Sequence, residues 1–386
     1  MLIKKIKDIC KFSVALLVSK LIKLNPQKRN IWVITERKSE CKDNGYYLFK
    51  YLREKHSNVE VYYAIEKNSK QREKIMNYGN ILNFNSFKHY IYALAANKLI
   101  GAFLPCGIPD SICFYKFPQL IKGKKIFLQH GITKENIKSL HYENTKASLF
   151  ICGGKPEARF VEKEFGYPDG AVKYTGFCRY DGLIDQKQGE FILFMPTWRQ
   201  WLPSSSFHSE DTAITESVYL KRINFLLRDK KLHHILKEKG LKLIFYPHHE
   251  LQCYLNMFEE KYSDNIIIAS EKDYDVQKLL LECKCLITDY SSVAFDVAYM
   301  KKPIIYYQFD EEEYYEKHYS KGYFSYTNDG FGEKCSNEQE VIEGVENIID
   351  SDFLMADLYK ARVERFFKYR DKNNCQRVYE EINNMR

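Results

Sequence analysis

Apolar runs of four to seven residues alternate with stretches of helical spacing along the first half of the chain. Continuous apolar runs predict short buried strands, and apolar residues three or four positions apart predict helices. The predicted strands are 31–35, 59–65, a short one near 81, 98–102, 125–128, 149–152 and 172–175. The predicted helices are 44–55, 70–78, 86–97 and 156–165. Strands that alternate with helices indicate a parallel sheet with helices on both faces.

The same alternation starts again after a polar stretch at 181–190, which we interpret as a linker. The second series has predicted strands at 191–195, 241–246, 265–269, 285–288 and 304–307. Its predicted helices are 216–239, 275–283 and a short one after 292. The expected fold class is therefore α/β, with two Rossmann-like domains in tandem.

The pattern divides the chain into four parts. Residues 1–26 are expected to form a basic amphipathic helix, 27–185 the first Rossmann-like domain, 186–351 the second, and 352–386 a helical C-terminal segment. The first helix has no uncharged stretch near the roughly 20 residues that span a bilayer. It fits a helix lying on an anionic membrane surface, and the alternative is a first helix packed on the protein body.

Composition narrows the function classes. At 386 residues, 45% apolar and 28% charged, the chain is typical of a globular protein of about two domains. A net charge of +8 suits a phosphorylated or polyanionic partner or an anionic membrane, and is too mild to indicate nucleic-acid binding. The 11 cysteines show no C-x-x-C spacing, which favours free thiols in a reducing cytoplasm.

Motifs of common nucleotide enzymes are absent from the sequence. Gly153-Gly154-Lys155 lacks the remaining residues of a phosphate-binding Walker loop, and no G-x-G-x-x-G fingerprint occurs. No Gly-x-Ser-x-Gly elbow and no paired-carboxylate motif occur either, so hydrolase hypotheses are weak. NAD-dependent hydride transfer and ATP hydrolysis lose most of their support.

The stretch 284–310 predicts a strand, a polar turn, a short helix and a second strand. Its turn, Asp289-Tyr290-Ser291-Ser292, follows the first strand, where ligands bind in open α/β sheets. The Ser291 and Ser292 hydroxyls favour an anion such as a phosphate. The alternative is that Ser292 only caps the helix.

Three further polar groups follow predicted strands. His130 is a candidate general base, with a hydrogen-bonded loop histidine as the alternative. Arg199 could grip a phosphate, or could stack on Trp198 at the surface. His248 and its neighbouring histidine could suggest a metal, but no third ligand has recognisable spacing. Their shared placement at strand ends favours one cleft between the two domains.

Together these segments resemble the CDP-glycerol glycerophosphotransferase family, bacterial enzymes that build teichoic acids and related capsular polymers. The resemblance rests on DNGYYLFKYLR (43–53), FLQHG (127–131), TGFCRYDGL (175–183), MPTWR (195–199), YPHH (246–249), ITDYSSVAFDVAYMKKPIIYY (287–307) and FFKYRDKNNCQRV (366–378). It implies a GT-B-like fold with an acceptor domain, a CDP-donor domain and a C-terminal helix crossing back. It also implies peripheral association with the cytoplasmic face of the membrane. The implied reaction transfers glycerol phosphate from CDP-glycerol to a hydroxyl, with release of CMP.

The resemblance also implies roles for individual residues. His130 would take the proton of the acceptor hydroxyl, and His248 would stabilise the transferring group. The implied donor-binding residues are Arg199, Thr288, Asp289, Ser291, Ser292 and Asp296, and Asp371 and Arg377 would complete the cleft on closure. One departure is that Ile132-Thr133-Lys134 replaces the Thr-Pro that often follows His-Gly in the family. The partner of the base therefore stays open.

Several alternatives remain at this stage. A GT-B glycosyltransferase using a nucleotide sugar would share the fold, and a membrane-surface scaffold with an inactive cleft would share the surface. The donor could be CDP-glycerol, CDP-ribitol or another CDP-polyol, and the acceptor a lipid-linked primer or a growing polymer. The sequence shows no cofactor and no metal site, and Mg²⁺ assistance with a diphosphate donor stays open.

Overall fold

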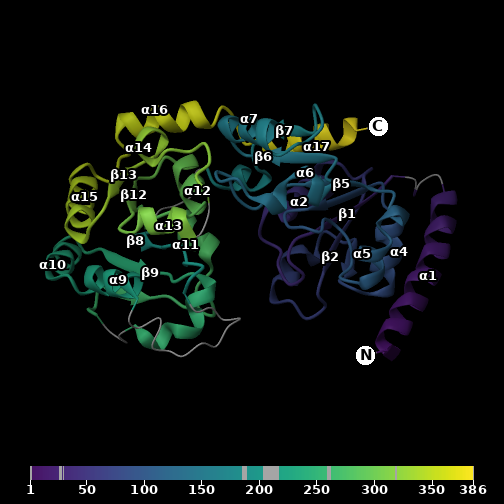
Figure 1. Cartoon of the computed structure of the whole chain (residues 1–386), viewed down its shortest axis with the longest axis horizontal. Helices are drawn as coiled ribbons and strands as arrows, with labels where there is room; N and C mark the ends of the chain where they lie inside the picture. Colours follow the sequence, from purple (N-terminus) through teal and green to yellow (C-terminus); the bar gives the residue numbers. More distant parts are fainter. Residues whose placement is uncertain are drawn as a thin grey trace. The chain divides into compact units, whose positions relative to one another are not determined.

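The computed structural model describes residues 2–25, 28, 30–184, 189–202, 217–258, 262–317 and 320–385. It divides the chain into two compact units. Unit 1 comprises residues 1–132, 137–182 and 369–386, and unit 2 comprises residues 133–136 and 183–368. Figure 1 shows the elements of both units.

Unit 1 is built on a parallel sheet, which has seven strands among the described residues, in the order β3-β2-β1-β4-β5-β6-β7. The strands are β1 (Ile31–Thr35), β2 (Glu60–Ile65), β3 (Ile81–Asn83), β4 (Lys98–Gly101), β5 (Lys124–Phe127), β6 (Leu149–Cys152) and β7 (Val172–Tyr174). The α-helices are α1 (Leu2–Leu24), α2 (Asn44–Lys55), α3 (Glu73–Met76), α4 (Phe87–Ala95), α5 (Ile112–Lys116), α6 (Tyr142–Thr145), α7 (Lys155–Glu164) and α17 (Asn374–Asn384). Short 3₁₀ turns include η5 (Cys178–Gly182). Central strands such as β1 are buried on both faces, which explains their continuous apolar sequences.

Unit 2 has a second parallel sheet, with six described strands in the order β10-β9-β8-β11-β12-β13. The strands are β8 (Phe191–Phe194), β9 (Lys242–Phe245), β10 (Ile266–Ile268), β11 (Cys285–Thr288), β12 (Ile304–Tyr307) and β13 (Glu333–Cys335). The helices are α9 (Val218–Arg228), α10 (Lys230–Glu238), η6 (His249–Met257), α11 (Val276–Glu282), α12 (Val293–Tyr299), α13 (Glu311–Lys317), α14 (Tyr326–Asp329), α15 (Glu338–Asp350) and α16 (Asp357–Phe366). Two Rossmann-like sheets confirm the predicted α/β class.

Some predicted elements have different bounds. The single helix predicted at 216–239 is two helices, α9 and α10, because Asp229 leaves the helical conformation and its carboxylate caps α10. Residue 216 and positions 185–188 of the predicted linker lie outside the described residues. The C-terminal segment also divides, since α16 belongs to unit 2 and α17 to unit 1.

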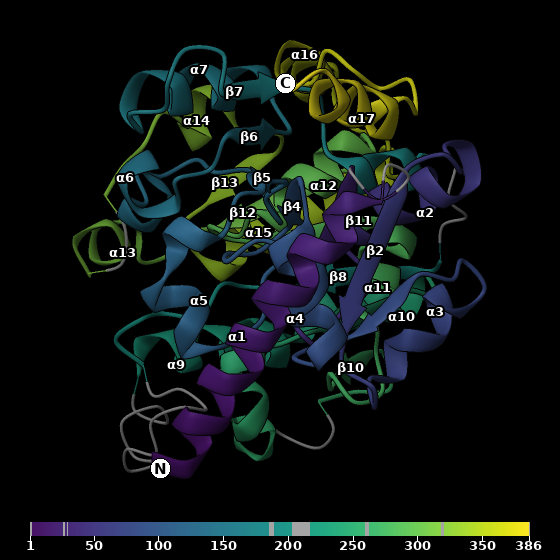
Figure 2. The same cartoon turned by 90° about the vertical axis from the view of Figure 1, so that its right-hand side faces the viewer.

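The first helix, α1, lies against α4 and α5 within unit 1 (Figures 1 and 2). Its inner face is buried at Phe12, Ala15 and Ser19. Leu17 and Leu21, in contrast, are 63% and 65% exposed. The helix therefore packs on the protein body through one side and exposes apolar side chains on the other. No helix among the described residues is long and apolar enough to cross a membrane.

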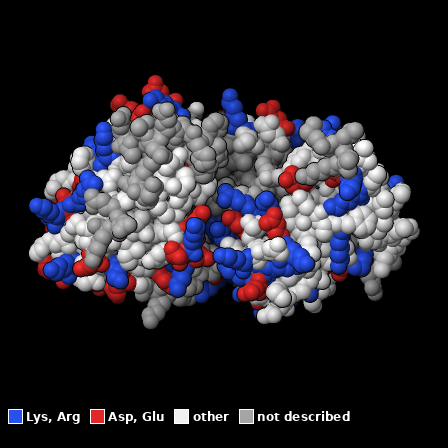
Figure 3. Space-filling view, turned by 90° about the horizontal axis from the view of Figure 1, so that it is seen from below, with Lys and Arg blue, Asp and Glu red and all other residues white. Residues whose placement is uncertain are grey.

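Charged side chains are distributed over both units. On the face shown in Figure 3, basic and acidic side chains of the described residues are interspersed. The net charge of +8 is therefore not gathered into one large patch on that face. Binding of an anion has to be argued from particular basic side chains.

Candidate functional site

His130 follows β5 at the carboxyl edge of the unit 1 sheet, and the residue before it has an unusual backbone. Gln129 has φ +58°, a left-handed conformation that costs energy outside glycine. Its side-chain Nε2 donates to the Ile151 carbonyl at 2.6 Å, and its own carbonyl accepts from Asn44 Nδ2 at 2.7 Å. These bonds hold the turn that presents His130.

The ring of His130 is exposed and stacks on Phe103, with ring centroids 4.6 Å apart and planes 17° apart. The Arg37 guanidinium lies over Phe103, 4.7 Å from the ring centroid. Although solvent reaches the imidazole, desolvation by the surrounding protein, together with the positive charges of Arg179 and Arg37, lowers the pKa of His130 to about 4. At neutral pH the imidazole is neutral and able to accept a proton.

A layer of carboxylates lies behind these basic groups. Arg179 donates to Asp43 Oδ1 at 3.0 Å, and both side chains are largely buried. Glu36 accepts from the backbone N–H groups of Lys42, Asp43 and Tyr46 at 2.7 to 3.0 Å. Burial and the Asp43 charge raise the pKa of Glu36 to about 7. This layer fixes Arg179 and the start of α2 beside the His130 turn.

In unit 2, Arg199 lies at the centre of a buried ionic network. The side chain is fully buried, and Nη1 donates to Asp289 Oδ2 at 2.7 Å and to the Thr197 carbonyl at 2.6 Å. Nε and Nη2 donate to the two carboxylate oxygens of Asp310 at 2.7 and 2.9 Å. Four of its N–H groups are thus directed to protein oxygens, so the geometry favours a role in positioning the turn.

The turn after β11 is anchored through Thr288 and Asp289. Thr288 Oγ1 donates to the Met195 carbonyl at 2.7 Å, and Asp289 Oδ1 accepts from the Thr197 N–H at 2.8 Å. Both residues are buried and connect β11 with the segment that follows β8. They are therefore placed to hold the turn rather than to face solvent.

The serines of this turn and Asp296 differ in exposure and bonding. Ser292 precedes α12 in a helical conformation, and its side chain makes no capping bond, whereas Ser291 Oγ accepts from the Val293 N–H at 3.5 Å. Ser292 therefore occupies the N-cap position of α12, as considered from the sequence, but its side chain makes no capping hydrogen bond. Both serines are partly exposed, while Asp296, on α12, is buried.

His248 follows β9 at the same edge of the unit 2 sheet. Its ring is partly exposed and lies parallel to Trp198, with centroids 6.4 Å apart and planes 16° apart. Trp198 is the residue before Arg199, so His248 adjoins the segment that carries the buried ionic network. The described residues contain no group of three or more His, Cys, Asp or Glu side chains placed to hold a metal ion.

The departure from the family pattern after His130 has a structural counterpart. Residues 133–136 belong to unit 2, although the chain on both sides belongs to unit 1. Lys134 is buried there, forms an ion pair with Glu135, and lies 5.9 Å from the Tyr326 ring centroid. Burial lowers the pKa of Lys134 to about 7, although the Asp289 carboxylate opposes that shift.

Asp371 and Arg377 both lie in unit 1, at the start of the C-terminal helix. Arg377 Nη1 and Nη2 donate to the two Asp371 oxygens at 2.8 and 3.0 Å, and Nε donates to the Thr175 carbonyl at 2.8 Å. The hydrogen bonds from Arg377 lower the pKa of Asp371. The pair therefore joins α17 to the segment after β7.

The predicted residues fall into groups. His130 lies at the unit 1 sheet edge, while Arg199, Thr288 and Asp289 come together at the unit 2 edge. Sequence reasoning missed Arg37 and Phe103, for which no motif exists. It also missed Arg179, which lies inside the segment TGFCRYDGL and could have been selected from it.

Comparison of the sequence with known proteins identifies one family and several relatives that make teichoic acids. Residues 17–384 match the family described as CDP-glycerol:poly(glycerophosphate) glycerophosphotransferase. The chain is 32% identical over 364 residues to the minor teichoic acid biosynthesis protein GgaB of Bacillus subtilis, covering 92% of this chain and 40% of GgaB. It is 25% identical to the teichoic acid glycerol-phosphate primase of the same organism, covering 66% of this chain and 62% of the primase. The chain thus spans less than two thirds of either relative.

Solved structures show the same fold. A solved structure of a variant of the wall teichoic acid polymerase TagF aligns with a TM-score of 0.66 at 16% identity, over 98% of this chain and 97% of the solved chain. Another TagF structure, soaked with CDPG, aligns at 0.64. A UDP-GlcNAc 2-epimerase from Neisseria meningitidis, bound to UDP-GlcNAc, aligns at 0.53 and 10% identity, over 92% of this chain and 99% of that one.

Proposed function

Since the chain belongs to the CDP-glycerol:poly(glycerophosphate) glycerophosphotransferase family, we propose that it transfers glycerol phosphate from CDP-glycerol to an acceptor hydroxyl and releases CMP. The observation that carries this proposal is the exposed His130, presented by a fixed turn and neutral at physiological pH. A neutral imidazole open to solvent is suited to accept the proton of an alcohol. The proposal that the product is a teichoic acid rests on the names of the relatives, which are teichoic acid proteins.

In the proposed reaction, the acceptor oxygen attacks the phosphorus atom that carries glycerol. The new bond joins this oxygen to phosphorus, and the bond from phosphorus to the oxygen of CMP breaks. The hydroxyl proton passes to His130, and the electron pair of the broken bond leaves with CMP. His248, on the unit 2 edge, stabilises negative charge on the phosphoryl oxygens.

We assign the donor to unit 2. Ser291 and Ser292 would donate hydrogen bonds to the diphosphate, because both side chains are partly exposed and that of Ser292 makes no capping hydrogen bond. Thr288 and Asp289 would hold the turn, and Arg199 would hold Asp289 and Asp310 in place. For Arg199 to bind the phosphate directly, part of its buried network would have to open.

The remaining site predictions have narrower roles. Asp296 is buried on α12 and would support the donor turn from within unit 2. Asp371 and Arg377 would position α17 in unit 1 and so stabilise that domain during the reaction. Any Mg²⁺ that assists the reaction would bind the donor diphosphate, whose oxygens are the ligands that this ion prefers.

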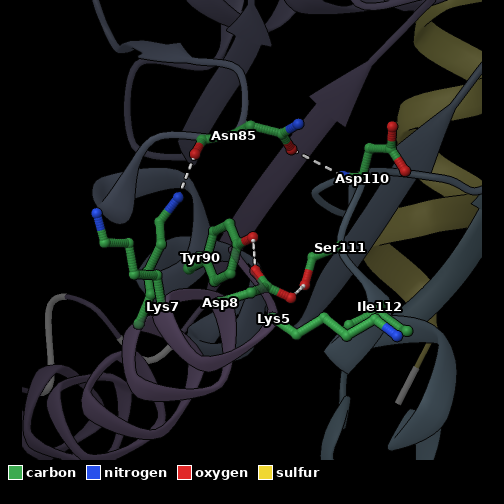
Figure 4. A pocket seen from close by; sticks show the side chains of 9 residues that line it. Lys5, Lys7, Asp8, Asn85, Tyr90, Asp110, Ser111 and Ile112 are labelled. Carbon is green, nitrogen blue, oxygen red and sulfur yellow. Dashed lines mark hydrogen bonds between the residues drawn. The ribbon is translucent and has the colours of Figure 1, made fainter. Parts of the chain in front are cut away.

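We further propose that unit 1 binds an anionic membrane surface through α1, and that a lipid-linked acceptor is reached there. The α1 helix carries exposed apolar side chains such as Leu17 and Leu21, and its Lys5, Lys7 and Lys11 help to line the pocket shown in Figure 4. Within it Asp8 accepts from Tyr90 and Ser111 at 2.6 and 2.7 Å and so attaches α1 to the domain. Apolar residues beside lysines are typical of helices that lie on membranes.

The direct test of the enzymatic proposal is CMP release. Purified protein is incubated with CDP-glycerol and a lipid-linked primer, or with a panel of nucleotide sugars, and the products are analysed by mass spectrometry. CMP together with a glycerol phosphate adduct supports the proposal. Transfer of a sugar in its place would support the alternative glycosyltransferase, which the 2-epimerase-like fold also permits.

Variants test the residue assignments. His130→Ala should lose transfer, and Ser291→Ala should raise KM for CDP-glycerol. The matched control for the histidine is His234→Ala. The His234 side chain is 77% exposed and lies on α10, outside the segments that follow the strands and carry the proposed site. Full transfer by His130→Ala would contradict the assigned base, whichever family activity is found.

A further inference from the structure

The surroundings of His130 contain more positive charge than a general base requires. Two guanidinium groups, Arg179 and Arg37, act on the imidazole electrostatically. A cation near a base stabilises its neutral form and so weakens it as a proton acceptor. Such an arrangement is unfavourable for catalysis unless something neutralises the cations when the reaction takes place.

The two arginines differ in what already holds them. Arg179 is buried and paired with Asp43 at 3.0 Å. Arg37 has a side chain that is 53% exposed and makes an ion pair with Glu40 at 3.7 Å, between neighbouring residues on one loop. Exposed pairs of this kind contribute little and are readily exchanged for another anion. Of the two arginines, Arg37 is therefore the one whose guanidinium N–H groups can bind a further anion.

Phe103 joins Arg37 and His130 into one surface. Its ring is stacked on the imidazole at 4.6 Å and lies below the Arg37 guanidinium at 4.7 Å. A guanidinium over an aromatic ring finds no hydrogen-bond acceptor in that ring, so its N–H groups can still be donated to an oxyanion. All these residues belong to unit 1, so the surface does not depend on how the units are arranged.

We propose that Arg37, held over Phe103, forms a subsite beside His130 that binds an anionic phosphate group of the acceptor, with the buried Arg179 adding positive charge behind it. The inference rests on the proposed function and specifies its acceptor: the hydroxyl that reacts belongs to a molecule with a phosphate or phosphodiester close by. A planar guanidinium matches two phosphate oxygens, which gives the subsite its preference for phosphate over a neutral polyol.

Binding of such a group would also activate the base. The charged groups that act on His130 are Arg37 and Arg179, with Asp43, Glu40 and Glu36 behind them. A bound phosphate would cancel part of the guanidinium charge and raise the pKa of His130 toward its ordinary value. The base would then gain strength only when an acceptor is present, which would limit hydrolysis of the donor by water.

A binding experiment tests the subsite without turnover. The full chain is titrated with glycerol 3-phosphate while NMR follows the His130 ring protons, assigned with His130→Gln. We expect saturable shifts and an upward movement of the His130 pKa, with the affinity reduced roughly tenfold to a hundredfold in Arg37→Ala. Lys38→Ala is the matched control, because Lys38 is the next residue and its side chain is 64% exposed. Equal affinity in wild type and Arg37→Ala would overturn the proposal.

A kinetic experiment separates this inference from the proposed function. Two acceptors of equal length are compared, one ending in glycerol phosphate and one a neutral polyol. Arg37→Ala should raise KM for the phosphate-bearing acceptor roughly tenfold or more and leave KM for CDP-glycerol and for the neutral acceptor unchanged. Equal effects on both acceptors would overturn the subsite. If wild type releases no CMP with any acceptor, the proposed function fails, whereas the NMR titration still decides whether the anion subsite exists.

Discussion

Arg199 and Asp310 form a two-pronged ion pair inside unit 2, with Nε donating to Oδ2 at 2.7 Å and Nη2 to Oδ1 at 2.9 Å. The residues are 111 positions apart and follow β8 and β12, so their contact joins the ends of two strands. Asp289, which follows β11 between them in the sheet, completes the network. The polar turn proposed to hold the donor thus rests on a buried charge cluster.

Removal of the guanidinium should destabilise unit 2 strongly. Arg199→Met leaves the carboxylates of Asp289 and Asp310 buried without their cation, so we expect a loss of about 3 to 5 kcal/mol in the free energy of unfolding. Urea denaturation followed by the fluorescence of Trp198 and Trp201, both in unit 2, measures it.

The control for this prediction is Arg222→Met in the same unit. Arg222 pairs with Glu338 at 2.9 Å, but its side chain is 35% exposed. We expect a loss of about 1 kcal/mol or less there, because partly hydrated pairs contribute little. Similar losses for both variants would show that Arg199 is not the support of the donor turn.

His130 should control an unusual pH profile. Because desolvation and the two arginines lower its pKa to about 4, the proton-accepting form is already dominant above that pH. We expect kcat/KM for transfer to rise with pH through about 4 and then to level off, and His130→Asn to reduce kcat by roughly 10² to 10⁴ fold. The profile is measured at saturating donor and low acceptor. If kcat/KM instead falls on acidification with a midpoint near the ordinary histidine pKa, the assignment of His130 is contradicted.

The strands were readable from sequence because parallel strands buried on both faces are continuous apolar runs. Strand β1 and helix α2 have the bounds that the pattern predicts. Strand β13, Glu333–Cys335, was not predicted, since its short polar sequence carries no periodic signal. The break between α9 and α10 was missed because apolar spacing continues across Asp229, whose cap interrupts the helix.

The site was only partly readable, for a physical reason. His130 and the Asp289 turn stand out because polar residues end apolar strands. The partners of Arg199 could not be predicted, because its contacts with Asp289 and Asp310 are made by tertiary folding. The stacking of Phe103 on His130 likewise joins the segments after β4 and β5, which the sheet order alone brings together.

A buried histidine elsewhere in unit 1 should couple stability to acidity. His89 on α4 is fully buried, its Nδ1 accepts from the Asn85 N–H at 3.1 Å, and burial lowers its pKa to about 3. Between pH 3 and 6.5 the unfolded chain binds more protons than the folded one at this residue, so stability rises with pH in that window. The contribution is complete above about pH 6.5 and is lost as the pH falls toward 3.

The measurement compares wild type with His89→Gln by urea denaturation in the Trp198→Phe/Trp201→Phe background, in which Trp32 in unit 1 is the remaining tryptophan. The wild type should lose stability more steeply on acidification, with a slope difference of about 1.4 kcal/mol per pH unit between pH 3 and 6.5. His234→Gln, at a 77% exposed side chain, should leave the wild-type slope unchanged. Parallel curves for wild type and His89→Gln would show that His89 does not titrate with folding.

The exposed side of α1 should determine binding to membranes. Leu17 and Leu21 are 63% and 65% exposed, and the charge of a glutamate at either position would oppose insertion among lipid chains. We expect Leu17→Glu/Leu21→Glu to abolish sedimentation with anionic vesicles while the fold is kept, because the helix is attached through its other face. The matched control is Leu354→Glu/Leu358→Glu in unit 2, at positions 66% and 59% exposed. Equal loss in both double variants would point to unspecific adhesion, and sedimentation of the α1 variant at wild-type levels would place membrane binding elsewhere on the chain.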